Sequence, residues 1–189
     1  MSYASNAGTF LIETLGGLVL LVFMLRFLMQ LVRADFHNPV SQFVVKMTNP
    51  VLRPLRRVIP GFGGIDMASV LILLVLQYAI LFLIAFMNGA YFPAVGMIVI
   101  AIAKLISLII TIFTFSILIQ VILSWVNPGT YNPVTSLLYS LNEPILGRAR
   151  RILPAIHGFD LSPIIAMIFL QLLNILLVAP IMDLGLSLR

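Results

Sequence analysis

The chain has 189 residues, of which 61% are apolar and only 9% are charged. Soluble domains carry about a quarter charged residues, so this composition excludes a soluble globular protein and predicts an integral membrane protein. The absence of cysteine excludes disulfides, thiolate metal sites and cysteine nucleophiles. A net charge of +5 in such a protein relates to orientation and lipid headgroups, and we expect no direct binding of nucleic acid.

Four apolar stretches are long enough to cross a hydrocarbon core of ~30 Å as helices. The first two spans are predicted at about residues 9–32 and 67–87. The first is too long for the core of a signal peptide, so we expect it to be retained. The other two are predicted at about residues 105–126 and 161–184. The predicted fold class is therefore all-α, integral membrane, with four transmembrane helices.

Residues 91–104 are apolar but lie outside these spans. Apolar sequence is almost continuous from Tyr91 to Trp125, and a single helix of this length would be ~50 Å long, which exceeds the bilayer. We interpret residues 91–104 as a short interfacial or re-entrant segment, or as a tilted extension of the third span. In either case Lys104 is expected to reach outward to the headgroups.

The chain contains an internal repeat. Asn38-Pro39-Val40 recurs 94 residues later as Asn132-Pro133-Val134. The same offset relates further prolines, arginines, aspartates and glutamines: Pro50, Arg56, Arg57, Pro60, Asp66 and Gln77 match Pro144, Arg150, Arg151, Pro154, Asp160 and Gln171. A constant offset without gaps indicates duplication of one unit. We predict two domains, residues 1–90 and 91–189, each with a span, a basic segment and a second span.

The basic residues predict the orientation. They cluster in the segments after the first and third spans, whereas residues 88–92 carry no charge. By the positive-inside rule, both basic loops are expected to face the cytoplasm and both termini to face the other side. Since each repeat has an even number of spans, the two copies run parallel, related by a pseudo-twofold axis along the membrane normal.

Each basic loop is predicted to form an amphipathic hairpin on the membrane surface. Asn38 and Asn132 are expected N-caps, because each precedes a proline at the first helical position. Apolar residues follow with helical spacing, and a second short segment begins after Pro50 and Pro144. Its arginines alternate with apolar residues, which places guanidinium groups at the level of the lipid phosphates.

The predicted contact site combines the arginines of the hairpins with two aspartates. Asp66 and Asp160 are expected to cap the returning spans within reach of the arginines. The set consists of Arg53, Arg56, Arg57, Asp66, Arg148, Arg150, Arg151 and Asp160. One interpretation is a site for anionic membrane lipids, a protein partner or a second copy of the chain. The alternative is that the arginines only set orientation and the aspartates only cap helices.

Polar residues inside the predicted spans form a second group: Arg26, Gln77, Gln120 and Gln171. Gln77 and Gln171 occupy equal depths near the midplane, so they are expected to hydrogen bond across the pseudo-twofold, or alternatively to line a solute path. Arg26 is expected to extend to the cytoplasmic headgroups. The alternatives for Arg26 are a buried ion pair with Asp66 or Asp160, or an anion site.

No sequence pattern for catalysis or for a cofactor is present. His37 and His157 lie outside the predicted spans and have no histidine counterpart in the other repeat, so we expect no haem. The chain lacks a metal-ligand cluster, a phosphate-binding loop and a nucleophile paired with a base. We therefore expect no enzymatic activity, no metal and no cofactor.

The repeated motifs resemble the YggT family of small multipass bacterial membrane proteins, which has relatives in plastids. The second copy carries Glu143-Pro144-Ile145-Leu146, Arg150-Arg151-Ile152-Leu153-Pro154 and Gly158-Phe159-Asp160-Leu161-Ser162-Pro163. The first copy carries Asn49-Pro50-Val51-Leu52, Arg56-Arg57-Val58-Ile59-Pro60 and Gly64-Ile65-Asp66. The resemblance covers nearly the whole chain, with departures at Gly147-Arg148-Ala149 and Met67-Ala68-Ser69.

The resemblance implies a link to osmotic tolerance, to division genes or, for plastid relatives, to cytochrome assembly or nucleoid organisation, and it implies no catalytic residue. We predict a non-enzymatic membrane scaffold or assembly factor that acts through its basic cytoplasmic hairpins. The alternative is a small channel or transport component involved in osmotic adaptation.

Overall fold

The computed structural model describes residues 3–90, 93–126, 132–152 and 160–188. Its regular elements within these ranges are all helical: α1 (Tyr3–Leu31), α2 (Pro39–Val58), α3 (Met67–Met87), α4 (Ala94–Val126), α5 (Pro133–Ile152), α6 (Ser162–Leu173), the π-helical η1 (Asn174–Val178) and α7 (Ala179–Ser187). Helices α1, α3, α4 and the continuous α6–η1–α7 are long and apolar enough to cross a membrane. This result confirms the predicted all-α class with four spans.

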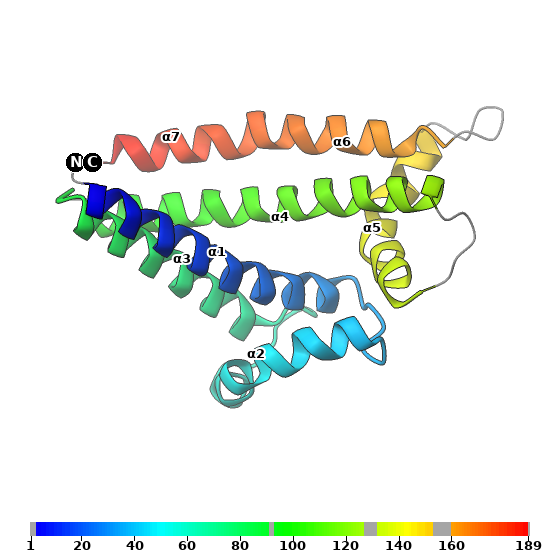
Figure 1. Ribbon diagram of the computed structural model, residues 1–189, viewed down its shortest axis with the longest axis horizontal. Helices are drawn as coiled ribbons and strands as arrows, with labels where there is room; N and C mark the ends of the chain where they lie inside the picture. The colour runs from blue at the N-terminus through cyan, green and yellow to red at the C-terminus, as the bar shows by residue number, and fades with distance from the viewer. Residues whose placement is uncertain (1–2, 91–92, 127–131, 153–159, 189) are drawn as a thin grey trace.

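The four long helices form two pairs, one for each half of the chain (Figure 1). Helix α1 packs against α3, and α4 packs against α6, η1 and α7, while the halves meet mainly through α3 and α4. The two chain termini lie at one end of the bundle, and α2 and α5 lie at the other end (Figure 1). The basic segments of both halves are therefore brought to the same end of the molecule.

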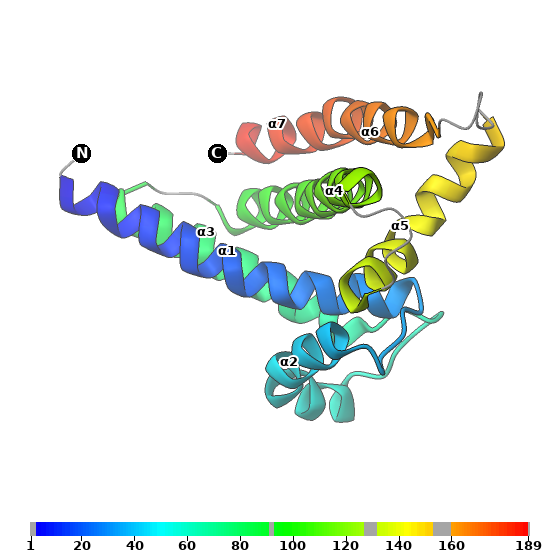
Figure 2. The ribbon, with the colours of Figure 1, turned by 45° about the vertical axis from the view of Figure 1, so that its right-hand side comes forward.

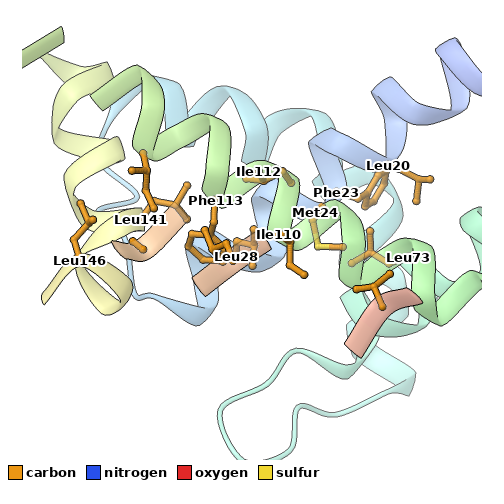
Figure 3. Close-up of a cluster of buried hydrophobic side chains, with 14 of the residues drawn as sticks. Leu20, Phe23, Met24, Leu28, Leu73, Ile110, Ile112, Phe113, Leu141 and Leu146 are labelled. Atoms are coloured by element: carbon orange, nitrogen blue, oxygen red, sulfur yellow. The ribbon is translucent and has the colours of Figure 1, made fainter. Parts of the chain in front are cut away.

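The apolar core lies between the two helix pairs (Figure 3). Leu20, Met24 and Leu28 of α1 meet Leu73 of α3 and Phe113 of α4 there. The outer surfaces of the same helices also carry large exposed apolar side chains, and their extent is far beyond the patches of a soluble monomer. A core of this kind combined with an apolar exterior is what a helix bundle in lipid requires, because its outer faces contact acyl chains rather than water.

Residues 94–104 belong to the third span. Helix α4 runs without a break from Ala94, so the interfacial or re-entrant interpretation is wrong for these residues and the helical extension is correct. Helix α1 also begins earlier than predicted, at Tyr3, whose repeat counterpart is Met97. Most of the apparent insertion is therefore the equivalent of the first turns of α1. Tyr91 lies outside the described residues.

The start of α4 packs closely against α7 through two glycines. A Cβ atom on Gly96 would lie 3.0 Å from the carbonyl oxygen of Gly185, and one on Gly185 would lie 3.0 Å from the backbone nitrogen of Ile100. The missing side chains thus allow the two backbones to approach, as small residues do at membrane helix interfaces. This contact secures the last span near the end of the chain.

The last span widens locally ahead of a proline. Helices α6 and α7 are joined by the π-helical turn Asn174–Val178, and Pro180 follows directly in α7. Proline has no N–H group to donate to the carbonyl of Leu176, and a π-helical turn is a common accommodation of such an interruption. The helix therefore continues through this position and ends close to the predicted boundary.

Each basic segment forms one helix where two short segments were predicted. Helix α2 continues through Pro50 and Pro54, and α5 continues through Pro144. A proline inside a helix removes a backbone donor and typically bends the helix. The ribbon of α2 accordingly changes direction part-way along its length (Figure 1). The first hairpin is thus a bent helix followed by a turn back to the next span.

Candidate functional site

The starts of α2 and α5 are capped and joined to one another. The Asn38 Oδ1 accepts a hydrogen bond from the Val40 N–H at 2.9 Å, and the Asn132 Oδ1 accepts one from the Thr135 N–H at 2.9 Å. Both predicted N-caps are therefore confirmed. The Asn38 Nδ2 also donates to the carbonyl oxygen of Pro133 at 2.6 Å. Figure 2 shows the start of α5 next to the loop between α1 and α2, where this bond links the two halves.

An ion pair ties the first hairpin to its returning span. The Arg56 Nε lies 3.1 Å from the Asp66 Oδ2, and the Arg56 Nη2 donates to the same oxygen and to the Gln30 Oε1. Asp66 is only 5% exposed and also accepts a hydrogen bond from the Ser69 hydroxyl. Burial alone raises the pKa of Asp66, but the bonds from Arg56 and Ser69 outweigh it, so this pKa lies below its usual value.

The second hairpin repeats the pair at the equivalent positions. The Arg150 Nε lies 3.1 Å from the Asp160 Oδ2, and the Arg150 Nη1 lies 3.1 Å from the Glu143 Oε2. Burial alone raises the pKa of Asp160. The hydrogen bonds from Ser162 and Arg150 together outweigh this effect, so the pKa lies below its usual value. The predicted reach between arginine and aspartate is confirmed in both copies.

The capping prediction for these aspartates is only half confirmed. The Asp160 Oδ1 accepts the Ser162 N–H at 2.9 Å at the start of α6. Asp66 occupies the N-cap position of α3, but its side chain bonds Arg56 and the Ser69 hydroxyl rather than a backbone N–H. The Asp66 carboxylate therefore lies beside the first turn of α3, where it is held by the side chains of Arg56 and Ser69.

The other four arginines of the predicted site are exposed. They are Arg53, Arg57, Arg148 and Arg151. None of them has an ion-pair partner within the described parts of the chain, although the Arg148 Nη1 donates to the Pro144 carbonyl at 3.1 Å. The eight predicted residues therefore divide into two structural ion pairs and four arginines that are displayed on the surface.

The helical spacing of the apolar residues in α2 predicted a single apolar face. In the structure these residues instead divide between two faces. Val44 is buried against the bundle, together with the small polar Ser41 and Thr48. Phe43 is 61% exposed and Met47 54% exposed, so they point away from the bundle. The difference arises because small residues of α2 pack against the bundle, which leaves the larger apolar side chains of Phe43 and Met47 to face outward.

Gln77 and Gln171 do not meet. Gln77 is buried on α3, whereas Gln171 is exposed on α6, and no hydrogen bond joins them in the described structure. The prediction of a bond across the pseudo-twofold is wrong, because the halves meet mainly through α3 and α4 rather than through α3 and α6. The equal distance of each glutamine from the start of its span predicted equal depth, but it did not reveal the rotation of each helix about its axis.

Gln120 and Arg26, which occupy equivalent repeat positions, have different surroundings. The Gln120 Oε1 accepts a hydrogen bond from the Asn142 Nδ2 at 2.8 Å, and the Asn142 Oδ1 accepts one from the Ser116 hydroxyl. Arg26 is buried beneath the first hairpin, with its Cζ 4.7 Å from the centre of the Phe36 ring. The expected extension of Arg26 to the headgroups is therefore wrong, and Arg26 has no ion pair within the described residues.

A cavity between the helix pairs was not anticipated. It has a volume of about 450 Å³, and its mainly apolar wall carries the polar side chains of Glu13 of α1, Gln77 of α3 and Lys104, Ser107 and Thr111 of α4. Lys104 thus faces a cavity between helices, whereas the sequence analysis expected it to reach outward to the lipid headgroups. The signal for this site was the presence of Glu13, an acidic residue well inside α1.

The histidines add no further site. His37 is exposed and contacts Asp35 through its Nδ1 at 3.2 Å. His157 lies outside the described residues. No group of three or more histidine, cysteine, aspartate or glutamate residues that could hold a metal occurs within the described ranges.

Comparison with known proteins adds family membership. The CCB3/YggT family model matches residues 5–87 and again 99–181. An uncharacterized protein of Pseudomonas aeruginosa is 47% identical, covering 92% of this chain and 89% of its own length. An uncharacterized protein of the proC 3′ region of Vibrio alginolyticus is 43% identical (91% and 94%), and the uncharacterized protein YggT of Escherichia coli K12 is 41% identical (89% and 88%). No solved structure matches.

Proposed function

Because the chain belongs to the CCB3/YggT family, whose matched relatives have no activity in their names, we propose a function from its own geometry. It acts as a non-enzymatic scaffold or assembly factor of the bacterial cytoplasmic membrane. Its working surface is the hairpin platform, which we define as α2, α5 and residues 59–66. The platform binds anionic lipids and docks a protein partner or a second copy of the chain.

The observation that carries this proposal is that the platform is braced and yet displays unused charge. Arg56 and Arg150 are occupied by Asp66 and Asp160, so they hold each hairpin to its returning span. The Asn38 side chain joins the two hairpins. Bracing of this kind reduces the conformational freedom lost on binding, and it favours recognition by a pre-formed surface.

The displayed residues have the composition of a membrane-surface contact. Helix α2 displays Arg53 and Arg57 together with the exposed apolar side chains of Phe43, Met47 and Val58. Exposed guanidinium groups contribute about 1 kcal/mol each near an anionic membrane surface, and apolar side chains beside them enter the headgroup region. Purely topogenic arginines would not need this bracing.

The platform faces the cytoplasm in this proposal, and both termini face the opposite side. The support is the excess of arginine in the two hairpins, together with the position of both hairpins at the end of the bundle opposite the termini. Four helices that could cross a membrane are consistent with this topology.

The test compares two sets of arginines in the full chain. The full-length protein, reconstituted in native-like membranes, is crosslinked and its partners are identified by mass spectrometry. A variant with Arg53, Arg57, Arg148 and Arg151 all changed to Gln should keep its fold and lose platform crosslinks to lipid and protein. A control with Lys104→Gln removes an intramembrane charge and should keep them. Equal crosslinking of all three proteins would contradict the scaffold.

A channel or transport component remains the second candidate, favoured by one specific observation. The cavity lined by Glu13, Gln77 and Lys104 places polar and ionisable side chains between the spans, where such residues commonly mark solute or ion paths. Ion flux into proteoliposomes that is abolished by Glu13→Gln and Lys104→Met, at unchanged thermal stability, would select this function over the scaffold.

A further inference from the structure

Arg26 is a buried cation whose hydrogen-bonding capacity is unused. Its side chain is 8% exposed, and its Nε and Nη1 have no hydrogen-bond partner within the described residues. The Phe36 ring covers one face of the guanidinium group at 4.7 Å. A cation–π contact of this kind attracts the charge but accepts no N–H bond, so the donors in the plane of the group remain unsatisfied. Arg26 also has no acidic partner within the described residues, so its buried positive charge favours an anion at any nitrogen of the group that a ligand can reach.

A cavity adjoins this arginine on the side of the first hairpin. It has a volume of about 380 Å³ and is lined by Arg26, Phe36, Gln42, Val45, Lys46 and Asn49. Two of these residues are cations and two are amides that can donate hydrogen bonds, whereas none is acidic. Nε and Nη1 are enclosed by protein atoms, which leaves Nη2 of Arg26 as the nitrogen able to meet a ligand. The cavity therefore suits a compact anion with several acceptor oxygens.

The other half of the molecule lacks this opening. At the equivalent position, Gln120 is neutral and accepts the Asn142 amide, and Asn142 in turn accepts the Ser116 hydroxyl. The corresponding residues of the first half are Thr48, whose hydroxyl donates to the Val44 carbonyl, and the apolar Val22. In the second half, the polar side chains at this position hydrogen bond to one another. In the first half, the charge of Arg26 has no such partner and is available to a bound ligand.

We propose that Arg26 and Lys46 bind a phosphate group in this cavity, with the amides of Gln42 and Asn49 as further donors. The phosphate belongs either to an anionic lipid headgroup or to free inorganic phosphate. A tetrahedral dianion or monoanion provides acceptors to both cations at once and neutralises the buried charge. The proposal does not rest on the scaffold function, because neither cation belongs to the ion pairs or to the four displayed arginines.

The test uses the full-length protein, delipidated in a neutral maltoside detergent that contains no phosphate. In one arm, inorganic phosphate is titrated and its binding constant is measured by calorimetry, with chloride at equal ionic strength as reference. In the other arm, native mass spectrometry counts phosphatidic acid and phosphatidylglycerol adducts against phosphatidylcholine. Binding in the first arm identifies the free ion, and selective adducts in the second arm alone identify a lipid.

The variants separate a specific site from general attraction to positive charge. Arg26→Gln copies the residue of the other half and should weaken phosphate or lipid binding at least ~10-fold, as expected for the loss of a charge-assisted bond. Lys46→Gln should weaken it less, and Lys104→Gln, which removes the same charge outside this cavity and outside the platform, should leave it unchanged.

Thermal unfolding distinguishes a loss of binding from a loss of folding. Without ligand, Arg26→Gln should unfold at the same temperature as the native chain or above it, since it removes an unpaired buried charge. With saturating ligand, only the native chain should gain thermal stability. Binding of neither phosphate nor anionic lipid by the native protein, or equal binding by Arg26→Gln, would overturn the proposal.

Discussion

The Asn38 side chain caps its own helix and donates to the Pro133 carbonyl at 2.6 Å, so a single amide joins the equivalent helix starts of both halves. The amide serves both roles because its oxygen accepts from α2 while its nitrogen remains free to donate. This bond is a direct hydrogen-bonded link between the hairpins and contributes to the bracing of the platform.

Separating these two roles is the first prediction. Asn38→Asp keeps the capping oxygen but loses the donor to Pro133, whereas Asn38→Ala loses both. We expect unfolding to become easier by about 1 kcal/mol for the first change and about 2 kcal/mol for the second. Asn132→Ala, which loses a cap alone, is the control. No destabilisation by Asn38→Asp, together with equal losses for Asn38→Ala and Asn132→Ala in detergent, would show that the bond between halves contributes nothing.

The Arg56–Asp66 pair predicts acid sensitivity of the first hairpin. The folded-state pKa of Asp66 lies below its unfolded value of ~3.9, so its stabilisation is complete above that value and is lost as pH falls through the lower folded pKa. The free energy of unfolding should therefore drop below about pH 4, and Asp66→Asn should flatten this dependence. Denaturation measured from pH 7 to pH 3 checks it. A native-like acid dependence in Asp66→Asn would contradict the role.

The glycine contact between α4 and α7 predicts a steric limit. Gly185→Leu forces a side chain against the backbone of Ile100 and should destabilise the fold by about 1–3 kcal/mol, as overpacking does. Gly17→Leu is a matched control on α1, because a Cβ atom there meets nothing within 4 Å. Thermal unfolding with circular dichroism compares them. Similar loss at both positions would mean that the close approach is not what matters.

Coupling energies between two substitutions distinguish residues that contact each other from residues that only lie at the same depth in the membrane. Gln77→Leu and Gln171→Leu should have additive effects, with a coupling below about 0.5 kcal/mol, because the structure keeps them apart. Gln120→Leu and Asn142→Leu should be coupled by more than this, because each single change leaves a buried partner unpaired. A double-mutant cycle for each pair measures both, and strong coupling of the first pair would restore the rejected bond.

The topology is testable because the chain has no native cysteine. Cysteine at position 53 or 148 should resist an impermeant maleimide in intact spheroplasts, whereas cysteine at position 90 or 186 should react. All four positions are exposed, so access to the reagent does not depend on unfolding. Ser41 is fully buried and would not report orientation. Labelling of position 53 or 148 before lysis would reverse the proposed orientation.

Much of the fold was predictable from sequence because it depends on local pattern. Apolar length determines which segments can cross a bilayer, and an Asn-Pro pair starts a helix wherever the chain places it. The reach between arginine and aspartate was also predictable, since the two residues are only ten positions apart in each copy, and the contact is present in both.

The remaining features depend on how the helices rotate and approach one another. Gln77 and Gln171 have equal depths, yet one is buried and the other is exposed, since a helix can turn about its axis without any change in the apolar pattern along it. Arg26 and Gln120 share a repeat position, but the packing of α2 and α5 beside them leaves the first without an acceptor and provides the second with a donor. Sequence alone thus determined spans, caps and local ion pairs, whereas only tertiary packing decided which polar groups meet, because those contacts join helices that are distant in the chain.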